Sequence, residues 1–250
     1  MTTLFKEAEK CLLCGQSHEY VRVGSTNEFG SPDLDTRPPE MRRSTMPYWI
    51  RRCPSCGYCA PEVSEGSGEV KRIVESREYR KQLGDRMYPE LANSFLCWAM
   101  IQEEVGDYAR AGWAALHAAW ACDDEGTPEA SRLCRLRAIE LFRQARAKGD
   151  TFIEGQGVEQ VIMADLLRRS GQFEQVGAMY QEGLPPSDPI GGLQAEPGKI
   201  VRDVLDFQKA LALLKDDRRH RIEEAVKQTP DRFNRGQAPA GERAIRRPKA

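Results

Sequence analysis

Two short stretches of this sequence, CLLCG at residues 11–15 and CPSCG at residues 53–57, decide how its N-terminal part is organised. Each has the form C-x-x-C-G, in which two cysteines separated by two residues can bind one face of a metal ion. The glycine that follows supplies the positive φ angle that such a turn requires. Four thiolates favour a closed tetrahedral site, so we expect one structural zinc ion, with iron as the chief competing metal. The expected ligands are Cys11, Cys14, Cys53 and Cys56.

Other interpretations of these cysteines have less support in the sequence. A single C-x-x-C can be a thioredoxin-like redox pair, but that motif belongs in a βαβ context, which is absent here. Cys59 extends the second pair to C-x-x-C-x-x-C, as in iron–sulfur proteins, yet the ferredoxin pattern needs a cysteine where this chain has Val63. Cys59 is then a packed small residue or an accessible thiol beside the zinc. His18 is an alternative ligand, although a lone histidine on a strand is more often a surface residue.

The residues around the two cysteine pairs, 1–62, are expected to form a zinc ribbon with a long inserted loop. Residues 18–23 alternate as a strand does, and residues 48–52 are a second strand candidate, rich in aromatic and β-branched side chains. Residues 24–47 lie between them and contain four prolines, which disfavour regular structure. A charged, partly helical connector is expected over residues 63–86.

From residue 87 onward the apolar residues recur at the spacing of α-helices. They return every three or four positions, so that each segment has one apolar face. Glycines and the pair Thr127-Pro128 mark where these helices end and begin. The sequence predicts helices near residues 87–105, 108–122, 128–148, 158–169, 173–182 and 200–214, with a loop over 185–198.

Two of these helix pairs carry small residues at spacings that resemble the tetratricopeptide repeat. Ala99, Ala111 and Ala118 belong to the first pair, and Ala164 takes the place of Ala99 in the second. Small residues at such positions let two antiparallel helices approach closely. We therefore expect a mainly α protein with a small β zinc ribbon, in which residues 87–228 form tetratricopeptide-like helical hairpins. An ordinary bundle of helical hairpins is the alternative.

The composition is that of a soluble globular protein. The 250 residues include 37 Lys and Arg against 38 Asp and Glu, a net charge of −1, so no chain-wide field attracts polyanions. No apolar run approaches the roughly 20 residues that span a bilayer, and the first residues lack the apolar part of a signal peptide. We expect a cytoplasmic protein without membrane contact, whose eight cysteines stay reduced. Residues 229–250 are polar and basic, and are expected to be a disordered tail.

The combination of these features resembles a known bacterial family. CLLCG, the long loop, the sequence YWIRRCPSCGY at residues 48–58 and the helical part together are similar to the family catalogued as domain of unknown function 2225. Its members join a zinc ribbon to tetratricopeptide-like helices, and the resemblance covers roughly residues 8–215. It implies the same four cysteine ligands. It implies no biochemical activity and no catalytic residues.

The sequence carries no motif that points to catalysis. Its three histidines fall in different regions, and it has no phosphate-binding glycine loop, G-x-S-x-G or H-E-x-x-H. Four sulfur ligands would also leave a zinc ion no open position for substrate. We therefore expect a non-enzymatic adaptor that binds a protein or peptide partner through the ribbon and the surface of the helical repeats.

The inserted loop supplies the candidate contact residues. Asp33, Asp35, Arg37 and Arg42 are expected to recognise a charged segment of the partner, the alternative being a polar loop held by its own turns and ion pairs. A zinc-ribbon regulatory protein that binds nucleic acid is the second functional hypothesis, and a thiol-based redox or metal sensor is a third. The second rests on arginines and aromatic residues that alternate near the second cysteine pair, a pattern suited to single strands. These residues are Arg42, Arg43, Tyr48, Trp49, Arg51 and Arg52.

Overall fold

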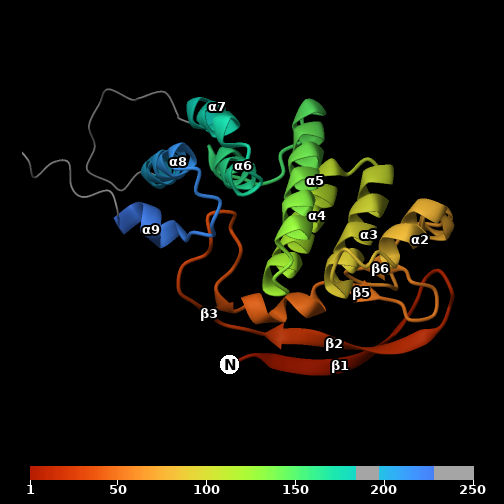
Figure 1. Ribbon diagram of the computed structural model, residues 1–250. Helices are drawn as coiled ribbons and strands as arrows, with labels where there is room; N and C mark the ends of the chain where they lie inside the picture. The colour runs from red at the N-terminus through yellow and green to blue at the C-terminus, as the bar shows by residue number, and fades with distance from the viewer. Residues whose placement is uncertain (184–196, 228–250) are drawn as a thin grey trace, which may run out of the picture.

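The computed structural model describes residues 1–183 and 197–227, which form a row of helices. The N-terminal strands and loop run along this row, beneath one set of helix ends (Figure 1). The strands are β1 (Thr3–Lys10), β2 (Ser17–Ser25), β3 (Glu28–Phe29), β4 (Glu40–Met41), β5 (Arg51–Arg52) and β6 (Cys59–Ala60). The helices are the 3-10 helix η1 (Arg43–Tyr48), α1 (Val70–Glu75), α2 (Arg77–Leu83), α3 (Glu90–Glu104), α4 (Tyr108–Asp124), α5 (Pro128–Ala147), α6 (Val158–Arg169), α7 (Phe173–Gly183), α8 (Pro197–Leu213) and α9 (Ile222–Lys227). The expected class, mainly α with a small β part, is confirmed.

The β part consists of three antiparallel pairs, of which the β1–β2 hairpin is the longest. The sequence pattern predicts β2 but not β1, because the side chains of β1 are almost all exposed and give no alternating apolar pattern. The strand expected over residues 48–52 is reduced to Arg51 and Arg52, since Tyr48 ends η1. The inserted loop is also more regular than expected, because it contains β3, β4 and η1.

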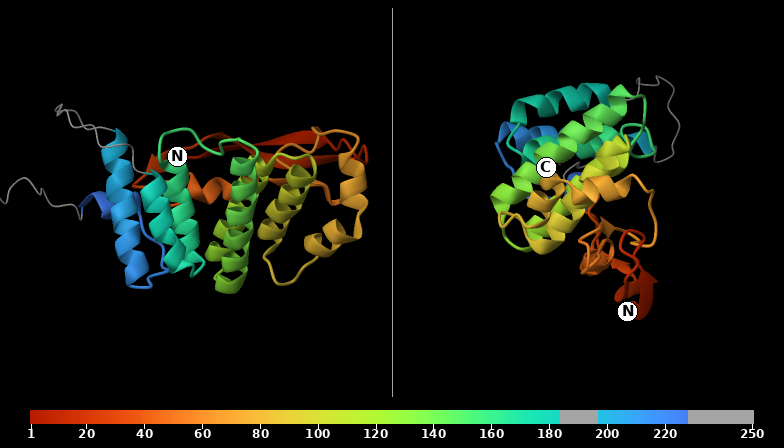
Figure 2. Two further views of the ribbon diagram at one scale, coloured as in Figure 1. Left: turned by 90° about the horizontal axis from the view of Figure 1, so that it is seen from above. Right: turned by 90° about the vertical axis from the view of Figure 1, so that its right-hand side faces the viewer.

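The helical part follows the sequence prediction closely. Each helix from α3 to α6 packs against the next along the chain, and α7 and α8 continue the row (Figures 1 and 2). Gly106, Gly126, Gly149 and Gly171 have positive φ angles and lie where helices end, which explains why glycine marked these ends in the sequence. Helix α9 was not predicted. Most of the loop expected at 185–198 and the tail expected at 229–250 lie outside the described residues.

The four alanines assigned to repeat positions, Ala99, Ala111, Ala118 and Ala164, are all buried. A tetratricopeptide-like arrangement of the pairs stays a prediction. No helix in the described part of the chain has the length and apolar character required to cross a membrane.

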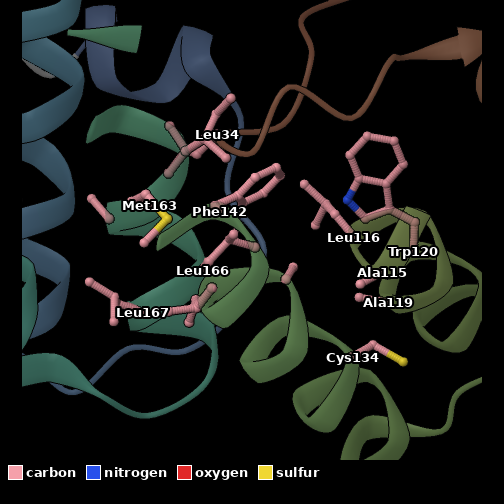
Figure 3. Close-up of a cluster of buried hydrophobic side chains, with 14 of the residues drawn as sticks. Leu34, Ala115, Leu116, Ala119, Trp120, Cys134, Phe142, Met163, Leu166 and Leu167 are labelled. Atoms are coloured by element: carbon pink, nitrogen blue, oxygen red, sulfur yellow. The ribbon is translucent and has the colours of Figure 1, made fainter. Parts of the chain in front are cut away.

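The hydrophobic core joins the N-terminal residues to the helices. Leu34 and Met46 of the inserted loop, with Ile50 just after it, belong to the large cluster formed by helices α3 to α9. Leu34 lies beside Phe142 and Met163 (Figure 3). A smaller cluster combines residues of the two cysteine turns with α1, α2 and the Cys97 and Ile101 side chains of α3. The boundary expected between residues 62 and 63 therefore does not divide the packed core.

Candidate metal centre and the adjoining aromatic cavity

The four predicted ligands form one compact group of thiols. The sulfur atoms of Cys11, Cys14, Cys53 and Cys56 all lie within 4.8 Å of one another. The Sγ atoms of Cys11 and Cys56 are 3.6 Å apart, as are those of Cys14 and Cys53. Zinc–sulfur bonds of about 2.3 Å in a tetrahedron place sulfur atoms about 3.8 Å apart, so the group has the size of a Cys₄ metal site. The structure therefore confirms that these residues can hold one metal ion together.

The two cysteine turns have the same backbone geometry. In the first, the Gly15 N–H donates to the Cys11 carbonyl at 2.9 Å, and in the second, the Gly57 N–H donates to the Cys53 carbonyl at 2.8 Å. The φ angles are +72° at Gly15 and +74° at Gly57, a region that L-residues with a Cβ rarely adopt. A Cβ on Gly57 would also lie 2.6 Å from the Leu83 side chain. The C-x-x-C-G pattern thus follows from the shape of the turn.

The surrounding elements hold the two turns in place. The first turn connects β1 to β2, and the second lies between β5 and β6. Helix α2 braces the second turn, because the Tyr79 hydroxyl donates to the Gly57 carbonyl at 3.0 Å and accepts from the Cys59 N–H at 3.0 Å. Arg80 donates to the Cys56 carbonyl at 2.8 Å. The site therefore depends on helices as well as on strands.

The local electrostatics differ between the thiols. A hydrogen bond from the Gln16 backbone lowers the pKa of Cys14, whereas burial raises the pKa of Cys53. A divalent cation would favour the thiolate form of all four. With four sulfur ligands in a tetrahedral shell, the chemistry that fits this donor set is structural stabilisation.

Cys59 and His18 lie outside this group of thiols. The Cys59 side chain is completely buried, and its backbone binds Tyr79 as described above. Its position fits the expectation of a packed small residue rather than that of an accessible thiol. His18 is hydrogen-bonded through Nε2 to the Ser55 hydroxyl at 2.9 Å.

Three of the four predicted partner-contact residues are buried, which corrects their assignment to an exposed contact surface. Asp33, Asp35 and Arg37 have relative exposures of 5%, 0% and 1%. The loop folds back onto the helices, where Asp33 pairs with Arg221 as an isolated β-bridge. Only Arg42 is exposed, and it forms an ion pair with Glu28 at 2.7 Å.

Asp35 and Arg37 instead belong to a buried ionic network between the loop and helices α4, α5 and α6. Asp35 accepts a hydrogen bond from the Trp120 indole at 2.8 Å and lies 3.6 Å from Arg169. Arg37 forms an ion pair with Asp124. The central carboxylate, Asp123, binds Arg135 at 2.6 Å and Arg169 at 2.9 Å, and these cations keep its pKa well below its usual range although burial opposes them. Spacing along the sequence gave no sign of this network, because its members lie up to 134 residues apart (35 and 169).

A large cavity adjoins the metal centre on the side of α3 and α4. Its volume is about 800 Å³. Its walls come from Trp49 and Ile50 just after η1, from residues 58–67 after the second cysteine turn, from Val70 of α1, and from the facing sides of α3 and α4. The aromatic side chains on its walls are Trp49, Tyr58, Phe95, Trp98, Trp113 and His117. A second cavity of about 510 Å³ shares Trp49, Trp113 and His117 with it and also contacts Trp120.

This aromatic cavity was not predicted from the sequence. The small residues Ala111 and Ala118 describe a different face of α4. The missed signal is the spacing of Trp113, His117 and Trp120, which step by four and three residues and so share a second face of α4. The ring centroids of His117 and Trp120 are 4.9 Å apart, and those of His117 and Trp49 are 5.3 Å apart.

Comparisons with protein-family models, with curated proteins and with solved structures find no match to this chain. The resemblance to the family of unknown function therefore stays a prediction.

Proposed function

We propose that this protein is a zinc-stabilised, non-enzymatic adaptor that binds a protein partner. The observation that carries the proposal is the aromatic cavity, which has one wall next to the four-cysteine group and the other on α3 and α4. Its volume lies within the usual range for ligand-binding sites, and aromatic side chains are the commonest anchors of protein interfaces.

The metal contributes by fixing one wall of the cavity. Residues 58–67 follow the second cysteine turn directly, and two contacts hold them: the Leu12 N–H donates to the Val63 carbonyl at 2.9 Å, and the Tyr58 hydroxyl donates to the Glu65 carbonyl at 2.7 Å. Since Leu12 lies between two of the zinc ligands, a bound ion would tie this wall to both cysteine turns. Zinc with four sulfur ligands serves such a structural purpose.

The arginines that suggested nucleic-acid binding are all paired with carboxylates of the protein itself. Arg43 pairs with Asp124 at 3.0 Å, Arg52 with Glu90 at 3.3 Å and Arg51 with Glu9. Arg42 pairs with Glu28, as noted above. Affinity for nucleic acid comes mainly from cations that neutralise phosphates. These ion pairs reduce the positive charge that is available for phosphate groups. This favours a protein partner over the nucleic-acid alternative.

Affinity capture of the tagged full chain from its own cells, with and without nuclease, tests the adaptor proposal. We expect the same protein partner in both samples, and its loss with Cys14→Ser, which removes one zinc ligand. The control is Cys122→Ala, since Cys122 is a buried cysteine of α4 outside the ligand group. Recovery of nucleic acid alone, abolished by nuclease, would replace the proposal with the nucleic-acid alternative.

A further inference from the structure

The tryptophans of this chain gather around one place. All four of them line the aromatic cavity or the smaller cavity beside it, and three of them, Trp49, Trp98 and Trp113, are only partly buried. A tryptophan needed only for the core is normally covered, as Trp120 is at 2% exposure. Partly exposed indole rings around a hollow are typical of surfaces that bind another chain.

Two neutral polar side chains line the cavity without a hydrogen-bond partner among the described residues. The Gln102 amide, at 5% exposure, and the His117 imidazole both line it, and neither side chain has a hydrogen bond to another described residue. An amide offers a donor and an acceptor, and so does a neutral imidazole. A ligand that supplies backbone N–H and C=O groups would therefore find hydrogen-bonding partners in both side chains.

The charges around the cavity are mainly negative. Glu62, Glu65 and Asp107 line it, against the single cation Arg110, whose side chain is 74% exposed. Glu62 pairs with Arg22 and Asp107 with Arg110, whereas Glu65 has no ion pair with any residue in 1–183 or 197–227. Carboxylates next to indole rings attract a cation on an apolar stem, since the rings attract the charge and cover the methylenes.

We propose that this aromatic cavity binds an extended peptide segment of the partner through a lysine or arginine anchor flanked by apolar residues. The anchor cation faces Glu65, its stem lies along the Trp98 and Trp113 rings, and Gln102 and His117 bind the peptide backbone. The proposal rests on the adaptor function and specifies the chemistry of the partner.

A random dodecapeptide phage library, selected on the immobilised full chain, tests this recognition. Selected peptides are then synthesised and titrated against the protein in solution. Because every tryptophan lines one of the two cavities, intrinsic fluorescence reports occupation directly. We expect the selected peptides to share a basic residue between apolar ones.

Substitutions on the rim of the cavity distinguish recognition of a basic anchor residue from non-specific hydrophobic binding. Glu65→Gln should weaken binding about threefold, and Arg110→Gln should strengthen it by a similar factor because it removes the competing cation. Trp98→Ala should weaken binding about tenfold or more. The matched control is Glu69→Gln, the same change at an exposed carboxylate four residues further on and outside the cavity, which should leave affinity unchanged.

Each contrary result has a defined meaning. Selected peptides that lack a basic residue and bind Glu65→Gln normally would overturn the proposed anchor. Peptides that bind Trp98→Ala as well as the wild type would place recognition outside this cavity and also overturn it, as would a selection that enriches no sequence. None of these results alters the outcome of partner capture from cells, which decides the adaptor function separately.

Discussion

Asp35 shows how burial changes what a charged loop residue does. Its carboxylate accepts hydrogen bonds from the Trp120 indole and from the Arg37 backbone at 3.2 Å, and it faces Arg169 and Arg135. Asp35→Asn removes the charge and leaves arginines buried without full compensation. We expect the free energy of unfolding to fall by about 3–5 kcal/mol.

Arg42→Gln is the control for this substitution, because Arg42 forms an exposed pair with Glu28 in the same loop. Removing such a pair costs about 0–1 kcal/mol. Denaturant unfolding of both variants measures the difference. Equal stabilities of the two variants would show that the buried network contributes no more than the exposed Arg42–Glu28 pair does.

His117 is a second residue whose environment makes a measurable difference. Burial, with help from Arg37 and against Asp35, lowers its pKa from 6.5 to about 4. Between these values the unfolded chain binds a proton that the folded protein does not, so acid favours unfolding. The stability contributed by the neutral imidazole is therefore complete above pH 6.5 and is lost as the pH falls towards 4.

His117→Phe keeps a ring in the aromatic cluster but removes this titration. Relative to this variant, the wild type should lose stability between pH 6.5 and 4 with a slope of up to about 1.4 kcal/mol per pH unit. Urea unfolding at several pH values measures the slope. Parallel profiles for the two proteins would mean that folding does not lower the pKa of His117.

The contrast between the cysteines and the loop charges shows what local sequence can predict. Cys11 and Cys14 make their turn together, so a spacing of three residues already specifies the geometry. Asp35 and Arg169 come together only because the loop folds onto α6, and nothing near either residue encodes that contact. The metal ligands could be predicted because each pair lies within one turn of the chain. The buried ion pairs could not, because tertiary packing brings their residues together.

At the scale of elements, two helical glycines provide a matched test of packing. A Cβ on Gly112 in α4 would lie 2.5 Å from the Phe142 ring of α5, which is itself completely buried. A Cβ on Gly177 in α7 would meet nothing within 4 Å. Gly112→Ala should therefore overpack the α4–α5 contact at a cost of about 1–3 kcal/mol. Gly177→Ala should stabilise by about 0.5–1 kcal/mol, because alanine favours the helix.

Thermal unfolding of the two glycine variants gives changes of opposite sign if α4 and α5 are as closely packed as described. A Gly112→Ala protein that melts with or above the wild type would contradict the close approach. The alanines of α4 were expected to pack against α3, and Ala111, Ala115 and Ala118 are all buried. Their burial does not by itself distinguish a repeat array from an ordinary bundle.

Element boundaries were predictable where glycine ends a helix and unpredictable where a strand lacks an apolar face. Helix α6 covers the residues expected for it, Val158–Arg169, because a repeating apolar face and Gly171 define it locally. Strand β1 is held by pairing with β2 and has little buried surface of its own. The strand forms because β2 pairs with it, and the apolar periodicity of a single segment does not reveal such pairing.

At the scale of the whole molecule, the N-terminal residues run the length of the helical row. One end holds the cysteine group against α2 and α3, and the other reaches α9, where the Leu34 N–H donates to the His220 carbonyl at 3.0 Å and the Ile222 N–H to the Pro32 carbonyl at 3.0 Å. Because one hydrophobic cluster combines residues of the cysteine turns with α1, α2 and α3, we expect the two parts to stabilise each other.

Metal removal tests this coupling. A structural zinc ion contributes about 10–16 kcal/mol in zinc-finger peptides, which is comparable to the roughly 5–15 kcal/mol stability of a whole domain. We expect about one zinc per chain in freshly purified protein, and we expect a chelator to lower the melting temperature of the helices as well as of the ribbon. Far-ultraviolet circular dichroism follows the helices, and tryptophan fluorescence follows the cavity. Because Tyr79 and Arg80 of α2 bind the second cysteine turn, both signals should change in one transition. This transition should occur at a lower temperature in the chelated protein and in Cys14→Ser.

Cys122→Ala is the control because it keeps all four ligands. It should bind zinc normally, and a chelator should lower its melting temperature by the same amount as in the wild type. Helices that melt unchanged after complete loss of the metal would show that the ribbon is an independent unit, and that the shared core contributes little to their stability.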